Sequence, residues 1–166
     1  GYNFSAASRV MALTPDKIEK FIRRGGKGLY IGIESGSQEV LDRIKKKLNI
    51  KEILNRTKWL NDAGIPWNAF FIAGFPFETL NDIKLTEELA YTIKPTFIAL
   101  SRFTPYPGTQ LWKEYYQNKS IRFLDLFQLN PENNVVQLES SSENYIEKMF
   151  QDFDKYNQNN KEKQAH

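Results

Sequence analysis

Apolar and polar residues alternate along the chain in blocks, which predicts strands and helices joined by short connections. Four segments have the length and apolar content of strands: NFSAASRV (3–10), GLYIGIES (28–35), PWNAFFIAGFP (66–76) and TFIALSRF (96–103). The run at 28–35 is continuously apolar, a pattern typical of a strand that is covered on both faces.

Residues at helical spacing fill the intervals between these strands. The expected helices start at about Pro15, Gln38, Lys51 and Thr79, and a short one follows the loop TPYPGT (104–109). Thr14 before Pro15 is a typical N-cap, and Thr79 with Asp82 has the spacing of a capping box. Strands that alternate with helices predict an α/β fold with a parallel sheet and right-handed crossovers.

The last part of the chain has a different pattern. Apolar residues at helical spacing between Tyr145 and Phe153 predict a helix that docks on the main body. The polar segment NQNNKEKQAH (157–166) predicts a disordered tail. We therefore divide the chain into residues 1–120, which hold the βα units, and residues 121–166, a C-terminal helical extension.

Composition narrows the classes of function. The chain has no cysteine and its single histidine is His166, so it offers no thiolate metal site, no disulfide and no histidine-based catalytic triad. The net charge of +3 comes without a long block of one sign, which does not indicate nucleic-acid binding. No apolar run approaches the roughly 20 residues of a membrane span. We expect a cytoplasmic protein that binds neither nucleic acid nor membrane.

Unusual residues gather where the predicted strands end. Glu34 and Ser35 end the strand at 28–35, and Glu78 follows the turn after the next strand. Because the carboxyl ends of parallel strands converge on one rim, we expect these side chains at one site. Carboxylates on two neighbouring strand ends are compatible with a glycosidase that uses Glu34 and Glu78. They are also compatible with carboxylates that cap turns or helix starts.

Gly74 and Pro76 interrupt the strand that precedes Glu78. A glycine at a strand end permits the close approach of a flat ligand, and a proline after it fixes the backbone. Gly32, inside an earlier strand, repeats this signal. A plain turn at the end of a strand is the alternative interpretation of Gly74 and Pro76.

Three segments taken together resemble the radical S-adenosylmethionine superfamily, in the sub-group whose members often carry a cobalamin-binding or other accessory domain. They are GIESGSQEVLDRIKKKLN (32–49), GIPWNAFFIAGFPFET (64–79) and RFTPYPGTQL (102–111). Each lies at the end of a successive strand, in the right order, and the resemblance covers about residues 4–111. It implies an incomplete (β/α) barrel of the TIM type with parallel strands, of which this chain holds about the third to sixth βα units, plus a C-terminal helix.

The resemblance also implies the chemistry of the intact parent, a radical Fe–S oxidoreductase or transferase. Its cofactors would be S-adenosylmethionine and a 4Fe–4S cluster, from which a 5′-deoxyadenosyl radical is generated, and an accessory domain would bring cobalamin. The substrate would be a small molecule, and catalytic residues and metal ligands are not assigned in this chain.

Several residues correspond to cofactor contacts of the family. Glu34 and Ser35 resemble a pair that holds the ribose, and Lys46, about three turns into the following helix, resembles a basic residue near the amino-acid end. The strand end with glycine and proline would line the adenine, and the loop at 104–109 would border the adenine or the substrate. The implied cofactor-binding residues are Arg9, Glu34, Ser35, Lys46, Ile72, Gly74, Phe75, Pro76 and Glu78.

The chain also departs from the family pattern. The three-cysteine loop that binds the cluster and the glycine-rich segment after the second strand are both absent. Phe77 stands where a glycine is usual, so the width of the adenine slot would differ from the family pattern. We therefore expect a C-terminal fragment that is inactive alone, with a cluster-free adenosine-binding or remnant module as the alternative. The unpaired strand edge near NFSAASRV predicts that two copies pair there.

Overall fold

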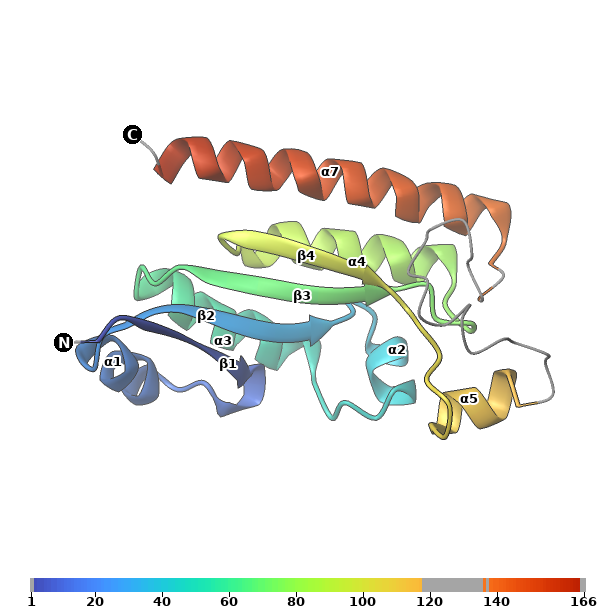
Figure 1. Ribbon diagram of the computed structural model, residues 1–166, viewed down its shortest axis with the longest axis horizontal. Helices are drawn as coiled ribbons and strands as arrows, with labels where there is room; N and C mark the ends of the chain where they lie inside the picture. Colours follow the sequence, from blue (N-terminus) through green and yellow to red (C-terminus); the bar gives the residue numbers. More distant parts are fainter. Residues whose placement is uncertain (1, 118–135, 137, 165–166) are drawn as a thin grey trace.

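Four parallel strands form one sheet, and they follow one another in the sheet in the order of the chain. The strands are β1 (Phe4–Arg9), β2 (Gly26–Glu34), β3 (Trp67–Ala73) and β4 (Phe97–Arg102). The computed structural model describes residues 2–117, 136 and 138–164. All four arrowheads in Figure 1 point toward the same end of the sheet, next to α2 and α5. The prediction of an α/β fold with a parallel sheet is confirmed.

Helices connect the strands at the places that the sequence predicts. They are the 3-10 helix η1 (Val10–Ala12), α1 (Pro15–Arg23), α2 (Gln38–Arg43), α3 (Ile50–Asp62), α4 (Leu80–Ile93), α5 (Gln110–Tyr115) and α7 (Ser140–Gln164). Thr14 Oγ1 accepts a hydrogen bond from Lys17 N and starts α1. Thr79 and Asp82 form the predicted capping box at the start of α4. These local hydrogen bonds explain why sequence patterns located both helix starts.

The two faces of the sheet are covered differently. On one face the side chains of Leu29, Ile31 and Ile33 are buried in the core, beneath helices such as α3 and α4 (Figure 1). On the other face Tyr30 is 42% and Phe70 38% exposed, and their rings lie 6.1 Å apart. The prediction that the strand at 28–35 is covered on both faces is therefore wrong for the described residues. An incomplete barrel has helices outside only, so its inward face stays open here.

Helix α7 covers the edge of the sheet formed by β4 (Figure 1). The buried Asn157 side chain accepts a hydrogen bond from Ile98 N and donates one to Ile98 O, both at 2.8 Å. One side-chain amide thus satisfies the two backbone groups of an edge residue, as a further strand would. The predicted disorder of the tail is wrong for residues 157–164, because contacts with a distant strand stabilise this polar segment.

Two predictions about the ends of the fold stay open. The expected boundary at residue 120 lies outside the described residues, as do residues 165 and 166 of the tail. Strand β1 is the other edge of the sheet, and within the described residues it pairs with β2 alone. Pairing of two copies through β1 stays a prediction.

None of the described helices is both long and apolar enough to cross a membrane.

Candidate functional site

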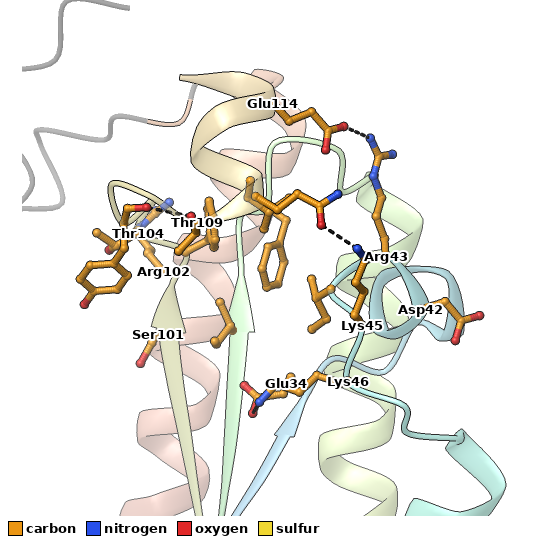
Figure 2. A pocket seen from close by; sticks show the side chains of 17 residues that line it. Glu34, Asp42, Arg43, Lys45, Lys46, Ser101, Arg102, Thr104, Thr109 and Glu114 are labelled. Atoms are coloured by element: carbon orange, nitrogen blue, oxygen red, sulfur yellow. Dashed lines mark hydrogen bonds and ion pairs between the residues drawn. The ribbon is translucent and has the colours of Figure 1, made fainter. Parts of the chain in front are cut away.

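A cavity of about 840 Å³ lies at the carboxyl ends of β2, β3 and β4 (Figure 2). Its walls come from these strand ends, from the segment that ends α2, and from the chain between β4 and α5. Helix α5 lies over the cavity, on the side away from the strands. The volume falls within the range of sites for small organic ligands. The rim that the sequence predicts therefore surrounds a ligand-sized space.

Glu34 is the acidic side chain at the base of this cavity. The residue has a left-handed backbone with φ of 74°, at an irregularity where β2 shifts its register against β3. Its carboxylate turns back over Gly32, where an added Cβ would lie only 2.7 Å from Glu34 Oε1. The absence of a side chain at Gly32 thus lets the carboxylate lie against the sheet. The predicted close approach at Gly32 is real, and the approaching group is Glu34 itself.

Lys46 reaches the same carboxylate, although it does not lie on a helix. Helix α2 ends at Arg43, and the chain then turns through Lys45 and Lys47, whose φ values are 58° and 52°. The expected position three turns into a helix is therefore wrong. This turn directs Lys46 Nζ to 2.7 Å from Glu34 Oε1, and the Glu34 side chain is only 12% exposed. The pair presents one anion and one cation to the cavity (Figure 2).

Ser35, which the resemblance pairs with Glu34, lies outside the cavity. Its side chain is fully buried, and its Oγ lies 3.1 Å from Thr86 Oγ1 on α4. Thr86 also accepts a hydrogen bond from Gly36 N at 2.9 Å, and Ser37 Oγ donates to Asp82 at 2.5 Å. The segment after Glu34 therefore joins the end of β2 to α4, and Glu34 is the residue of this motif that faces the cavity.

The strand end around Gly74 contributes two side chains to the cavity. Ile72 and Phe75 line it, and Pro76 is not part of its lining. Gly74 itself is buried and has φ of 91°, and an added Cβ would lie 3.7 Å from Leu138 Cδ1. Its role in the structure is to permit a left-handed turn beneath the C-terminal part of the chain. Gly74 is not part of the cavity lining, and the close approach of a flat ligand to it stays a prediction.

Glu78 is buried and holds the turn after β3. Its Oε2 accepts hydrogen bonds from Gly74 N at 2.6 Å and Phe75 N at 3.2 Å, whereas its buried Oε1 has no hydrogen-bond partner among the described residues. Burial raises the pKa of Glu78 to about 7, against the opposing effect of the two backbone hydrogen bonds. Because Glu78 does not line the cavity, the glycosidase alternative that pairs it with Glu34 is wrong.

Two arginines end the outer strands of the sheet: Arg9, the last of the predicted contacts, and Arg102, which the sequence did not indicate. Arg9 ends β1 in register with Gly32, is exposed, and is not part of the cavity lining. Arg102 ends β4, lines the cavity, and pairs with Glu143 at 2.7 Å and with Glu147, both on α7. Thr104, Tyr106 and Thr109 of the predicted loop also border the cavity. No signal in the sequence connects Arg102 with α7, because their partnership spans 41 residues.

Of the cofactors implied by the family resemblance, the cavity suits S-adenosylmethionine. A carboxylate can accept hydrogen bonds from the hydroxyl groups of a ribose, and the adjacent Ile72 and Phe75 offer apolar surface to a base. The side chains that line the cavity therefore fit an adenosyl compound. A 4Fe–4S cluster needs thiolate ligands, and this chain has no cysteine. The residues present do not fit the cluster.

Comparisons with known proteins identify the family of the chain. A family model described as the Radical SAM superfamily matches residues 1–90. An uncharacterized methyltransferase of Pyrococcus horikoshii is 28% identical over 149 residues, which are 89% of this chain and 32% of the relative. The chain thus spans about a third of the length of this relative.

Solved structures show the same fold. The structure of Elp3 from the archaeon Methanocaldococcus infernus matches with a TM-score of 0.61 at 16% identity, over 68% of this chain and 27% of that one. The radical S-adenosylmethionine methyltransferase TsrM from Kitasatospora setae, solved with cobalamin and a [4Fe-4S] cluster bound, matches with a TM-score of 0.53 at 12% identity. That match covers 59% of this chain and 20% of TsrM. At these identities the likeness concerns the fold alone.

Proposed function

Because the chain belongs to the radical S-adenosylmethionine superfamily, we propose that its cavity binds the adenosyl part of S-adenosylmethionine. The observation that carries this proposal is the position of Glu34. Its carboxylate lies over Gly32 at the end of β2 and shares the cavity with Ile72 and Phe75. Glu34 would accept hydrogen bonds from the ribose hydroxyl groups, and the two apolar side chains would contact the adenine. Lys46 keeps Glu34 in place through their ion pair.

The proposed ligand set is narrower than the set that the family resemblance implies. Ser35, Gly74 and Glu78 would act indirectly, by holding the ends of β2 and β3 in position. Arg9 would contact a ligand that extends from the cavity toward β1. The loop at 104–109 would form the border of the site on the β4 side.

The intact parent, by this proposal, is a radical enzyme, an oxidoreductase or a transferase, to which this chain supplies part of the cofactor site. In such a parent, a cluster bound by residues outside this chain would supply the reducing electron, and S-adenosylmethionine would be the source of a 5′-deoxyadenosyl radical. Because the cluster ligands are absent, the chain alone would bind the cofactor and would not cleave it. By the same proposal, cobalamin would be a further cofactor of the intact parent, bound by an accessory domain.

Replacement of Glu34 with glutamine tests the proposed site. The amide keeps the shape of the carboxylate and removes its charge, so binding of S-adenosylmethionine should weaken about tenfold, as expected for the loss of a charge-assisted hydrogen bond. The measurement is calorimetric titration of the 166-residue chain without iron. Glu39→Gln, which removes an exposed carboxylate of α2 outside the cavity, should leave the affinity unchanged.

The same titration tests the adenosyl site that the fragment and the cluster-free binding module have in common, and a reconstitution assay tests the assignment as a partial site. Binding without iron that depends on Glu34 supports an adenosyl site in either a fragment or a cluster-free binding module. Activity of the chain after reconstitution with iron and sulfide would contradict its assignment as a partial site. Equal affinities of the Glu34→Gln variant and the unaltered chain would contradict the placement of the ribose at Glu34.

A further inference from the structure

We propose that Arg43 is a positioning residue that holds α5 closed over the cavity and thereby slows the release of the bound ligand. The inference rests on the proposed function for the identity of that ligand. The contacts that hold α5 are independent of that identity, because they join residues of the chain to one another.

Arg43, the last residue of α2, joins three separate parts of the chain. Its guanidinium carbon lies 4.2 Å from the centroid of the Phe77 ring, which belongs to the turn between β3 and α4. Its Nη2 lies 3.2 Å from Glu114 Oε1 on α5 and also donates a hydrogen bond to the Tyr115 hydroxyl group. We call the group of Arg43, Phe77, Glu114 and Tyr115 the clasp.

A second contact parallels the clasp on the same side of α5. Lys45 Nζ donates a hydrogen bond to Gln110 Oε1 at 2.6 Å. Figure 2 shows both contacts crossing from the end of α2 to α5, and all the residues joined by the dashed lines there line the cavity. Opening of α5 away from α2 would therefore break both contacts and widen the mouth of the site.

Helix α5 depends on such contacts because it is short and, in the part of the chain that the structure describes, has no buried side chain. It contains only six residues, which is too short for a helix to be stable without tertiary contacts, and none of its residues is buried. The buried Tyr116 anchors the chain directly after the helix. Lys45 and the loop before the helix thus hold the first residue of α5, Gln110. Arg43 holds its last two residues, Glu114 and Tyr115.

Phe77 gives the clasp its connection to the wall of the cavity. Its ring stacks on the ring of Phe75 with a centroid distance of 5.5 Å and an interplanar angle of 21°, and Phe75 lines the cavity. Phe77 itself is not part of the cavity lining, so it does not narrow an adenine slot directly. The residue that departs from the family pattern instead provides the aromatic face on which Arg43 rests.

The size of the effect follows from the exposure of these groups. The side chains of Arg43 and Glu114 are 42% and 43% exposed, so their ion pair is partly screened by solvent. A cation over an aromatic ring at such a partly exposed site adds a stabilising free energy of similar size to that of the ion pair. Together they should shift the equilibrium between closed and open α5 by about five- to tenfold.

The test compares Arg43→Gln with a matched control, Arg23→Gln. Arg23 also pairs with a glutamate, Glu19, but lies on α1 away from the cavity. Amide hydrogen exchange at 110–115, measured without ligand, should be about five- to tenfold faster in Arg43→Gln and unchanged in Arg23→Gln. Dissociation of S-adenosylhomocysteine, measured by stopped flow, should accelerate by the same factor. Arg43→Lys, which keeps the charge and loses the planar stacking group, should recover part of both effects.

The outcomes separate the clasp from the proposed function. Unchanged exchange at 110–115 in Arg43→Gln would overturn the clasp, whatever the ligand. Faster exchange with an unchanged dissociation rate would overturn the positioning role. A chain that binds no S-adenosylhomocysteine would overturn the proposed function and the ligand role with it, while the exchange data would still decide whether Arg43 holds α5.

Discussion

Replacement of Gly36 with alanine is expected to lower the free energy of unfolding by about 3 kcal/mol, because the added methyl group meets rigid backbone. An ideal Cβ at Gly36 would lie 2.1 Å from Leu85 O and 2.6 Å from Leu85 C. These atoms belong to α4, so the strain cannot be relieved by a rotation of a side chain. The hydrogen bond from Gly36 N to Thr86 Oγ1 would be disturbed as well. Urea unfolding monitored by tryptophan fluorescence measures the change.

Gly28→Ala is the matched control for this prediction. Gly28 lies within β2, whereas Gly36 follows that strand. An added Cβ at Gly28 would lie 3.3 Å from Ser5 Oγ, the end of a side chain that can move, and 3.5 Å from Pro66 O. The expected loss is below about 1 kcal/mol. Equal unfolding midpoints in urea for the two variants would contradict the prediction. They would show that close packing against α4 does not limit the size of the side chain at position 36.

The behaviour of this segment shows how far a motif predicts a site. The order of residues in ESGS correctly located the end of a strand at the rim, because strand patterns are local. It did not reveal which side chains face the cavity. The left-handed backbone at Glu34 directs its side chain into the cavity. Thr86, which follows Ser35 by 51 residues, holds the serine side chain on the opposite side, against α4. Contacts of this range leave no periodic signal in the sequence.

The same distinction explains the successes and failures for the fold. Helix starts at Thr14 and Thr79 were predictable because each depends on hydrogen bonds within three residues. The helical tail at 157–164 was not, because the stability of its polar sequence depends on contacts between Asn157 and β4. The open face of the sheet was missed for a related reason. An apolar run shows that a strand can be buried on both faces. Whether helices or strands actually cover both faces depends on the rest of the chain.

The residues that hold α5 could not be predicted by the same means. The clasp combines an arginine at the end of one short helix with side chains 34 to 72 positions away, of which only Phe77 stood out in the sequence. Phe77 was noticed because it departs from the family pattern, and the expected consequence concerned the width of the adenine slot. The structure places its ring against Arg43 instead.

Between pH 5 and pH 8 the chain should lose stability as the pH rises, because of Glu78. The pKa of this carboxyl is about 7 in the folded chain, above the ordinary value of 4.5, since burial disfavours the charged form. The folded state therefore holds a proton that the unfolded state has already released. The stabilisation is complete below pH 4.5 and is lost as the pH rises through 7, with a total of about 3 kcal/mol. Urea unfolding at several pH values measures the loss.

Glu78→Gln supplies the decisive comparison, because glutamine resembles the protonated acid and does not titrate. The difference in unfolding free energy between the two chains should change across this pH range, with the variant relatively more stable at pH 8 than at pH 5. Asp82 does not interfere: burial alone would raise its pKa, but hydrogen bonds from Ser37 and Thr79 bring that pKa below the ordinary value of 3.8. Parallel pH profiles for the two chains would show that Glu78 does not carry the buried proton. Glu78 accepts hydrogen bonds from the backbone N–H groups of Gly74 and Phe75, and Phe75 lines the cavity. Ionisation of Glu78 therefore places a negative charge directly behind the wall of the proposed adenosyl site.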